Sequence, residues 1–412
     1  MEFLSLTDAQ HCILQHSAKS ATETIELMQS LGRVLAEQVK SNRDHPPYDV
    51  SAMDGYAVRA ADLQHVPVTL KIVEDIKAGS MPTMAVLPGQ CARIMTGAPL
   101  PQGADTVIRV EDTDALDAGA VQINLAADLG ADIRTRGENL RDGAVVFEPG
   151  ITITPGVLGI LAMVKYAQPV VYQRPRVAIL SSGDELEGLH DPFDVNKIPD
   201  ANSYTLMAQV QALGIEPTLL GIARDDPIEL SQYLMRGLEF DVLLISGGTS
   251  VGVYDFVRPT IEALGIKMHF WRVAIRPGHP LAFGTTPNNL VFCLPGNPVS
   301  SMVCFEQFVA PALRSIMGHT RVYRRTLTVR LAHAVKHRVG RAEFVRVTLS
   351  RDETGYVATA TGSQGSGVLL SMAHADALLL VPGDSNGLAA GEMAEVQLLD
   401  GTAYQTQCEV TP

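Results

Sequence analysis

The stretch RVAILSSGDE, residues 176–185, joins a run of apolar residues directly to two hydroxyls, a glycine and two acidic side chains. A short apolar run that ends in turn residues is typical of a buried β-strand. The same pattern, an apolar run followed by small or acidic residues, recurs at PTLLGIARDD (217–226) and at DVLLISGG (241–248). These segments predict three strands, each of which ends in small or acidic residues.

Segments long enough for amphipathic helices separate these apolar runs between residues 174 and 323. Further strands are expected at MHFWRVAI (268–275) and NLVFCL (289–294). The expected helices are SYTLMAQVQALG, PIELSQYLMRGLE, DFVRPTIEALG and PVSSMVCFEQFVAPALRSIMG. Apolar strands that alternate with helices predict a doubly wound, mostly parallel α/β domain with helices on both faces of its sheet. Ligands of such domains bind at the carboxyl ends of the strands.

The N-terminal residues and a later segment predict a helical and linker domain, made of residues 1–41 and 140–173. Thr7 and Gln10 form an expected capping box before AQHCILQHSA, and ETIELMQSLGRVLAEQV has the apolar spacing of a helix. The second segment, TPGVLGILAMVKYAQPVVYQ, has the pattern of a helix followed by a strand.

Two further regions have sequence patterns that are typical of short strands. Residues 42–139 are rich in turn signals such as HPPYD, GSMP and GAPLPQG, and predict an inserted β-rich domain. Residues 324–412 contain short alternating runs (RTLTVRLA, EFVRVTLS, YVATAT, ALLLVPG, AEVQLLD) and predict a small C-terminal β-barrel. A chain of 412 residues has room for several domains.

Composition excludes several classes of function. The formal net charge of −13 argues against non-specific binding to nucleic acid or to an anionic membrane. Five cysteines without a C-x-x-C pair indicate neither a disulfide framework nor a zinc ribbon. The sequence has neither an evident signal peptide nor an apolar run of the roughly 20 residues that cross a bilayer. We therefore expect a soluble, cytoplasmic protein.

Acidic side chains after neighbouring strands predict one shared site. Glu185, Asp225 or Asp226, and Asp255 offer hard oxygen ligands, which suit Mg²⁺ held partly by a substrate phosphate. One of the two adjacent aspartates is expected to cap the helix that begins at Pro227, which leaves only the other for a ligand.

The glycine-rich turn after DVLLI is the second candidate element of this site. Its members are Ser246, Gly247, Gly248, Thr249 and Ser250. Adjacent glycines allow close backbone approach, and the hydroxyls and amides can cradle the phosphate of a nucleotide or pterin. Taken alone, such a loop is more often a packing turn, and the neighbouring carboxylates favour the binding role.

Cationic groups follow in AIRPGHPLAFG (274–284), and a second shaped loop follows in LPGNPVS (294–300). Arg276 and His279 bring positive charge to an acidic protein, although a plain surface hairpin remains an alternative for His279. His333 and His337 lie in a strand-like segment, where the pair is expected to be surface polar residues rather than metal ligands.

Eight motifs occur together in a fixed order: SAMDGYAV, RIMTGAP, RGEN, SSGDEL, ARDDP, SGGTSVGVYD, RPGHPLAFG and LPGNPVS. In this order and spacing the chain resembles the molybdopterin molybdenumtransferase family, the MoeA type that includes the gephyrin E domain. The resemblance covers essentially the whole chain. It implies a Mg²⁺-dependent transferase that inserts molybdate into adenylated molybdopterin, releases AMP and forms the molybdenum cofactor.

The same resemblance implies a homodimer of four-domain subunits whose active cleft is shared between subunits. Partners would be a molybdopterin adenylyltransferase and other proteins of the cofactor pathway, with no nucleic acid and no membrane. Asp54 and Thr96 would face the cleft from the partner subunit. From the α/β domain, catalytic or metal-binding roles would fall to Glu185, Asp225 or Asp226, Asp255, Arg276 and His279. The cofactor-binding set would be Ser246, Gly247, Gly248, Thr249, Ser250, Pro298, Ser300 and Ser371, the last of these near Gln364–Gly365–Ser366.

Three residues depart from the usual motifs of this family. Asn139 stands in RGEN where a carboxylate is usual, and Arg276 and His279 stand where lysines are common. These departures motivate one alternative, a weakly active paralogue that serves as a binding or scaffold subunit. A second alternative is a molybdopterin adenylyltransferase, since that smaller family shares the GG-T-S loop.

Overall fold

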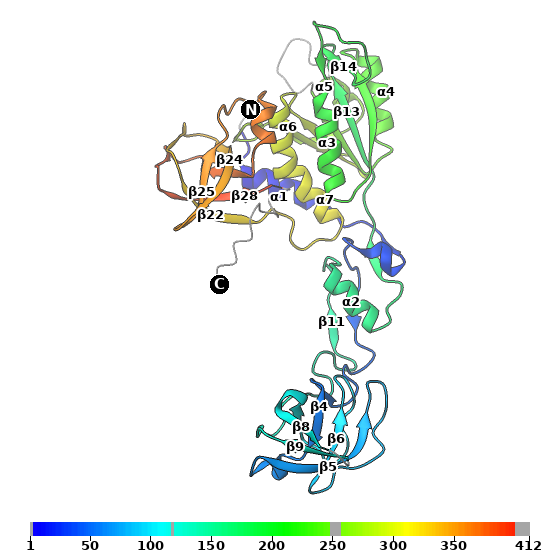
Figure 1. Cartoon of the computed structure of the whole chain (residues 1–412). Helices are drawn as coiled ribbons and strands as arrows, with labels where there is room; N and C mark the ends of the chain where they lie inside the picture. The colour runs from blue at the N-terminus through cyan, green and yellow to red at the C-terminus, as the bar shows by residue number, and fades with distance from the viewer. Residues whose placement is uncertain (1–2, 117–118, 248–256, 400–412) are drawn as a thin grey trace. The chain divides into compact units, whose positions relative to one another are not determined.

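The computed structural model describes residues 3–116, 119–247 and 257–399 (Figure 1). The chain divides into two compact units. The first unit contains Met1–Ala36, Gly150–Thr154 and Pro169–Pro412, and the second contains Glu37–Pro149 and Pro155–Gln168. The division into four domains remains a prediction.

A six-stranded sheet in the order β16-β13-β17-β21-β20-β18 forms the centre of the first unit. Its strands are β13 (Val177–Ser182), β16 (Pro217–Ala223), β17 (Val242–Ser246), β18 (Lys267–Phe270), β20 (Ala282–Thr285) and β21 (Leu290–Leu294). β16, β13, β17 and β21 are mutually parallel, whereas β20 is antiparallel to both of its neighbours. The prediction of a mostly parallel sheet is confirmed.

The predicted strand 268–275 is only partly correct. β18 ends at Phe270, and Ile275–Arg276 form a separate short strand, β19, which pairs with β24 (Ala342–Asp352) of the C-terminal domain. β20 begins inside the segment predicted as a shaped loop. It pairs with β18 and β21 because Phe283 and its neighbours complete the apolar face of the sheet.

Alternate residues of each strand enter two different apolar cores. Val177 and Ile179 of β13 belong to one core, and Ala178 and Leu180 belong to the other. This is the period of two expected for a strand that is buried on both faces. The continuous apolar runs in the sequence follow directly from that double burial.

Helices cover both faces of the sheet (Figure 1). On one face lie α1 (Leu6–His16), α3 (Ala201–Ala212), α6 (Pro298–Cys304) and α7 (Ala310–Ile316). α4 (Pro227–Gly237) and α5 (Val257–Ala263) lie on the other. A single π-helical turn, Phe305–Val309, joins α6 to α7.

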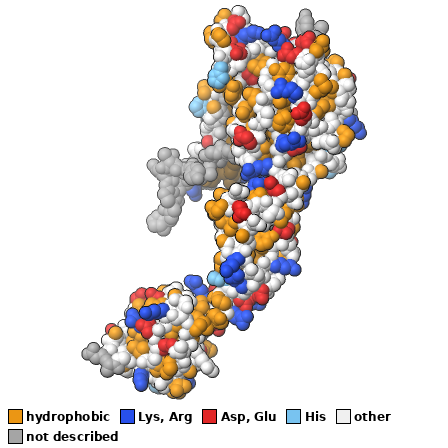
Figure 2. Space-filling model, turned by 90° about the vertical axis from the view of Figure 1, so that its right-hand side faces the viewer, with side chains coloured by type: hydrophobic (Ala, Val, Ile, Leu, Met, Phe, Trp, Pro, Cys, Tyr) orange, Lys and Arg blue, Asp and Glu red, His pale blue; other side chains and the backbone are white. Residues whose placement is uncertain are grey.

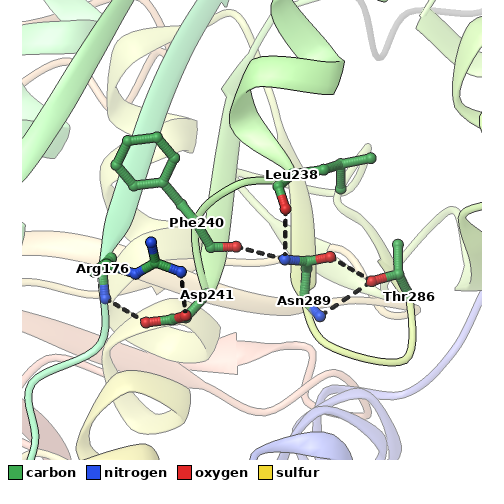
Figure 3. A network of polar contacts seen from close by, with 6 residues as sticks. All are labelled: Arg176, Leu238, Phe240, Asp241, Thr286 and Asn289. Carbon is green, nitrogen blue, oxygen red and sulfur yellow. Dashed lines mark hydrogen bonds and ion pairs between the residues drawn. The ribbon is translucent and has the colours of Figure 1, made fainter.

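Two groups of polar contacts hold the amino edge of this sheet (Figure 3). The Arg176 backbone and side chain donate to the Asp241 carboxylate at 2.7 and 3.0 Å. The amide of Asn289 donates to the carbonyl oxygens of Leu238 and Phe240. These contacts fix the loops that lead into β13, β17 and β21.

The N-terminal segment is less helical than its sequence predicts. α1 is present, but Ser5 caps it by accepting from the Asp8 backbone, so the proposed capping box at Thr7 is wrong. The helix predicted over ETIELMQSLGRVLAEQV is also wrong, because pairing with distant segments replaces it. This stretch holds β1 (Thr22–Thr24), which pairs with β12 (Val170–Tyr172), a 3-10 turn (Leu27–Ser30) and the start of β2 (Val39–Lys40).

The C-terminal strands close into a five-stranded barrel, as predicted. Its strands are β22 (Thr326–Leu331), β24, β25 (Gly355–Ala360), β26 (Ala377–Val381) and β28 (Met393–Leu398). Closure follows from the pairing of β24 with β26 in addition to the order β24-β25-β22-β28-β26. α8 (Leu369–Ala373) and the short pairs β23 (Val335–Lys336) with β27 (Gly387–Leu388), and β14 (Leu186–Glu187) with β15 (Ile198–Pro199), complete the first unit.

The second unit is β-rich, as predicted for the inserted region. Its six-stranded sheet has the order β7-β4-β6-β5-β9-β8. The strands are β4 (Gly55–Val58), β5 (Val68–Ile76), β6 (Gln90–Ile94), β7 (Thr106–Arg109), β8 (Thr113–Leu116) and β9 (Ala120–Ile123). The unit also contains α2 (Pro155–Met163) and the pairs β2 with β11 (Val145–Phe147) and β3 (Val50–Ser51) with β10 (Ile133–Arg134).

The surface carries charges of both signs. Figure 2 shows basic and acidic side chains interspersed with hydrophobic ones on the face that it draws. Among the described residues, every helix is too short or too polar to cross a membrane.

Candidate active site

Carboxylates converge where β13 and β16 end. The Asp225 backbone N–H lies 3.3 Å from Oδ1 of Asp184. The pKa of Asp225 is raised, first by burial and then by the negative charges of Asp184 and Glu185. A raised pKa from these causes means that acidic groups crowd one another here. The structure therefore brings the side chains of Glu185 and Asp225 close to each other, and their role in one shared site stays a prediction.

The adjacent aspartates have different roles. Asp226 is the N-cap of α4, and its Oδ1 accepts from the backbone N–H groups of Ile228 and Glu229 at 3.0 and 2.8 Å. Pro227 follows at the first position of the helix. Asp226 is thus occupied by capping, and Asp225 is the aspartate of the pair that lies beside the other carboxylates.

The glycine-rich turn begins in a tightly fixed position. The Ser246 hydroxyl accepts from Nδ2 of Asn202 at 2.8 Å, and the same amide donates to the carbonyl oxygen of Gly296 at 2.7 Å. Gly247 has a φ of +96°, and a Cβ there would lie 2.3 Å from the carbonyl oxygen of Ser182. Only glycine fits this position, because any side chain would collide with the end of β13.

The remaining predicted residues of that turn, Gly248, Thr249 and Ser250, lie outside the described residues, as does Asp255. Within the described part, the end of β17 is joined directly to the end of β21. The Gly247 N–H donates to the carbonyl oxygen of Leu294 at 3.2 Å, and the buried Ser182 hydroxyl has no hydrogen-bond partner among the described residues.

A pocket of about 380 Å³ lies beside the end of β21. Its wall brings together four segments that are far apart in the sequence. The lining residues include Arg276, His279, Asn297, Ser300, Arg341, Gln364, Gly365 and Ser366. Pro298 is the first residue of α6 and sets the start of that helix behind the pocket, and the Val299 N–H donates to the Ser366 carbonyl oxygen at 3.1 Å.

Two arginines give this pocket its positive charge. Arg276 Nε lies 3.4 Å from the carboxylate of Glu343, which also accepts from Nδ1 of His337 at 2.8 Å. The His337 side chain is only 2% exposed, so its interpretation as a surface residue is wrong. His279 lies in the same wall, and its pKa is lowered by burial and by the charges of Arg341 and Arg272. His279 is therefore neutral at pH 7, and the arginines carry the charge.

A buried arginine supports the pocket from the C-terminal domain. Arg346 is 1% exposed, and its guanidinium donates to the Ser371 hydroxyl and to the carbonyl oxygens of Ser363 and Gly365. The Ser371 hydroxyl also lies 2.8 Å from that of Thr361. Ser371 is therefore buried against Arg346 and does not line the pocket itself. The loop Gln364–Ser366, which Arg346 also contacts, lines the pocket instead.

In the second unit, Asp54 and Thr96 contact each other. One carboxylate oxygen of Asp54 accepts from the Thr96 backbone N–H at 2.7 Å and from its hydroxyl at 2.8 Å. These bonds, and the charge of Arg93, lower the pKa of Asp54, which keeps it ionised. Asn139 lines a neighbouring pocket of about 700 Å³ with Arg134 and Gly97. The SAMDGYAV, RIMTGAP and RGEN motifs are thus close together in space.

Three contributors to this arrangement escape prediction from the sequence. They are Asn202, Arg341 and Arg346. Asn202 lies in the first turn of α3, where an asparagine is common at helix starts and would not by itself indicate a binding role. Arg346 lies two residues after Phe344 on β24, so both side chains are on the same face of the strand, and Phe344 belongs to the core of the α/β domain. An arginine on such an apolar face is the sequence feature that could have identified it.

The geometry defines a class of protein. It is an enzyme domain of the doubly wound α/β type, with carboxylates and a glycine turn at the carboxyl edge of its sheet and a cationic pocket beside them. Sequence comparison then identifies the family. The chain matches the "MoeA N-terminal region (domain I and II)" over residues 4–164, the "Probable molybdopterin binding domain" over 178–315 and the "MoeA C-terminal region (domain IV)" over 328–399.

Relatives of known name cover almost the whole chain. It is 36% identical to the molybdopterin molybdenumtransferase of Nostoc sp., over 90% of this chain and 87% of that protein. It is 33% identical to the enzyme of that name from Haemophilus influenzae, over 91% and 93% of the two chains. The crystal structure of the molybdopterin biosynthesis MoeA protein from Pyrococcus horikoshii OT3 superposes with a TM-score of 0.82 at 29% identity, over 97% of this chain and 100% of that one. The chain belongs to the molybdopterin molybdenumtransferase family.

Proposed function

We propose that this protein is a molybdopterin molybdenumtransferase, which inserts molybdate into adenylated molybdopterin, releases AMP and yields the molybdenum cofactor. The observation that carries the proposal is the convergence of Asp225, Glu185 and the Ser246–Gly247 turn at neighbouring strand ends. Cleavage of a phosphoanhydride needs opposite charges at close range to neutralise the phosphates and the leaving group.

The donor set at the carboxylates fits Mg²⁺. Asp184, Glu185 and Asp225 repel one another in the absence of a cation, as the raised pKa of Asp225 reflects. Mg²⁺ usually keeps several waters and takes further oxygens from a substrate phosphate, so one or two protein carboxylates are enough to hold it. Asp225 and Glu185 would hold the ion, with Asp255 as a further proposed ligand. Bound Mg²⁺ would supply charge neutralisation at the phosphoanhydride.

The chain's own residues would divide the remaining work between them. The Ser246–Gly247 turn and the Ser182 hydroxyl offer donors to the phosphate or the pterin, and Gly248, Thr249 and Ser250 are proposed to continue this cradle. Arg276 and Arg341 attract an oxyanion such as molybdate into the pocket that Ser300 and Gln364 line. Glu343 orients Arg276 through their ion pair, so that the guanidinium is pre-positioned.

We further propose a homodimer in which Asp54 and Thr96 of the partner subunit complete the cleft. The ionised state of Asp54 and its fixed hydrogen bonds to Thr96 suit a carboxylate that orients a ligand rather than one that packs in a core. Mixed dimers test this directly. A heterodimer of an Asp54→Ala chain and an Asp225→Asn chain contains one intact cleft, so it should regain up to half of the activity of a normal dimer, whereas either variant alone should be inactive.

The function itself is tested by reconstitution. Purified protein, adenylated molybdopterin, molybdate and Mg²⁺ should yield AMP and a cofactor that activates a molybdenum-free apoenzyme. Intact adenylate and metal-free pterin at the end of the reaction would contradict the proposal. ATP-dependent adenylation of free molybdopterin would support the adenylyltransferase alternative, and tight adenylate binding without turnover would support the scaffold alternative.

Cys12, Cys91 and Cys304 lie within the described residues and are free thiols. Free thiols are typical of a reducing compartment. This supports the proposed cytoplasmic location, and a disulfide-linked form isolated from cells would argue against it.

A further inference from the structure

A cluster of soft metal ligands lies away from the proposed active site. Cys12 and His16, one turn apart on α1, face His269 of β18. One potential ligand atom from each residue lies within 4.8 Å of those of the other two, and it is the only such group of three among the described residues. The rings of His16 and His269 have centroids 4.1 Å apart. Thiolate and imidazole together are the ligands of zinc and related transition metals, not of Mg²⁺.

Both imidazoles are already oriented by their other ring nitrogens. Nδ1 of His16 lies 2.8 Å from the backbone carbonyl oxygen of Cys12, which can only accept, so Nδ1 carries the proton and Nε2 has the lone pair. Nε2 of His269 lies 2.9 Å from the Thr285 hydroxyl, which leaves Nδ1 for a ligand. Metal-binding histidines commonly show this pattern, because the second hydrogen bond fixes the tautomer and the ring orientation.

The strand is distorted where it presents His269. The register between β18 and β20 shifts between Met268 and Phe270, which makes His269 the bulged residue. Met268 packs in the core beneath α4 and α5, whereas Phe270 packs in the core beneath α1. In a regular strand these two residues would share a face. The bulge therefore redirects the side chains here and lets His269 face α1.

Access also suits a metal ion. Cys12 is only partly buried and His16 is exposed, so an incoming ion can reach both side chains. His16 and Thr285 line an open pocket of about 480 Å³, which gives an ion and its waters a route in.

We infer that Cys12, His16 and His269 form a site for a borderline-soft divalent metal such as Zn²⁺, with three protein ligands and a fourth position open to the pocket. Atoms bound to one zinc lie roughly 3.3 to 3.7 Å apart, so small side-chain rotations of the exposed His16 would close the set around the ion. The site lies towards the amino edge of the sheet, because Thr285 pairs with Leu290, the first residue of β21. It is therefore separate from the strand ends that carry the proposed reaction.

Cobalt is the most direct probe, because a cobalt–thiolate bond produces a charge-transfer absorption that oxygen ligands cannot. Titration of the reduced full-length protein with Co²⁺, in the presence of excess Mg²⁺, should give one such site per chain. Zn²⁺ should displace the cobalt and raise the Tm, since a ligand that binds only the folded state stabilises it.

Matched variants separate this site from adventitious binding. Cys12→Ser should abolish the thiolate band, and His16→Ala or His269→Ala should weaken cobalt binding at least tenfold. His11→Ala, an exposed histidine on the same helix whose ring contacts Gln15, should leave binding unchanged. Absence of the band in the unaltered protein, or its survival in Cys12→Ser, would overturn the inference. Reduced circular-dichroism signal identifies any variant that fails to fold, and Zn²⁺-dependent Tm shifts in His269→Gln then provide the second test, since loss of the shift is expected and its persistence would contradict the site.

Discussion

The two edges of the central sheet use the same kinds of polar residue for different purposes. At the amino edge, the Arg176 side chain is bonded to Asp241, and the Asn289 amide is bonded to the carbonyl oxygens of the loop that leads into β17 (Figure 3). At the carboxyl edge, Asp225 has a raised pKa beside like charges, and the Ser182 hydroxyl has no partner among the described residues. Satisfied groups stabilise a fold, whereas crowded charges and unused donors cost stability and are retained where a ligand completes them.

This contrast predicts its largest effect at Asp225. Replacement by Asn removes one negative charge from the proposed Mg²⁺ site while preserving shape and hydrogen bonding. We expect the rate of Mg²⁺-dependent AMP release to fall by roughly 100-fold or more, a loss typical of removing one electrostatic contributor to a transition state. Single-turnover assays over a range of Mg²⁺ concentrations measure it. Unaltered AMP release would remove Asp225 from the mechanism.

The opposite edge should show the reverse pattern. Asn289→Ala leaves the carbonyl oxygens of Leu238 and Phe240 without their amide donor. We expect the free energy of unfolding to fall by about 1 to 2 kcal/mol, since the site is partly buried and water replaces some of the lost bonding. Urea denaturation gives this value, and AMP release at 25 °C provides the comparison. If Asn289→Ala lost turnover but kept its stability, the amino edge would have a role in the reaction, and the proposed difference between the two edges would be wrong.

A smaller effect is expected at His279, which tests whether molybdate binds in the pocket beside β21. His279 is neutral at pH 7 because burial, Arg341 and Arg272 lower its pKa. His279→Lys restores a compact positive charge to the pocket, and we expect molybdate to bind several-fold more tightly near neutral pH. The dependence of cofactor formation on molybdate concentration measures the change. An identical dependence in both proteins would place His279 outside the oxyanion's reach.

The least effect is expected in the pH dependence of stability. The folded-state pKa of Asp225 is raised above its unfolded value, so its contribution favours folding at acidic pH and is lost as the pH rises through the folded pKa. Asp225→Asn should therefore increase stability at pH 7, by less than about 1 kcal/mol because solvent screens the repulsion. The gain should vanish at acidic pH. Thermal unfolding at several pH values measures it, and a destabilised variant at pH 7 would show that the carboxylate is paired rather than crowded.

Sequence patterns predicted the parts of the fold that depend on local burial. The strands at 177–182, 217–223 and 242–246 are recognisable because both of their faces are apolar. The segment that includes Thr22–Thr24 was predicted as a helix because its spacing fits one, yet its pairing with Val170–Tyr172 decides its conformation. Pairing partners that are 150 residues apart along the chain leave no local signal.

The candidate site, like the fold, was predictable only where a local sequence pattern marks its residues. Residues at or near the carboxyl ends of strands, such as Ser246 and Glu185, could be found from their position in the sequence. The choice between Asp225 and Asp226 could not, because either can cap a helix that begins at Pro227, and only the hydrogen bonds of Asp226 distinguish them. Arg346 and Asn202 act across segments that meet only in the folded chain.

The most direct measurement is a crystal structure of the protein with AMP, molybdate and Mn²⁺, in which anomalous scattering locates the manganese. The account predicts a manganese peak coordinated by Asp225, with the nucleotide phosphate beside the Ser246–Gly247 turn and molybdate in the pocket that Arg276 and Arg341 line. Nucleotide and metal bound together in the amino-edge pocket, with the carboxyl edge empty, would contradict it.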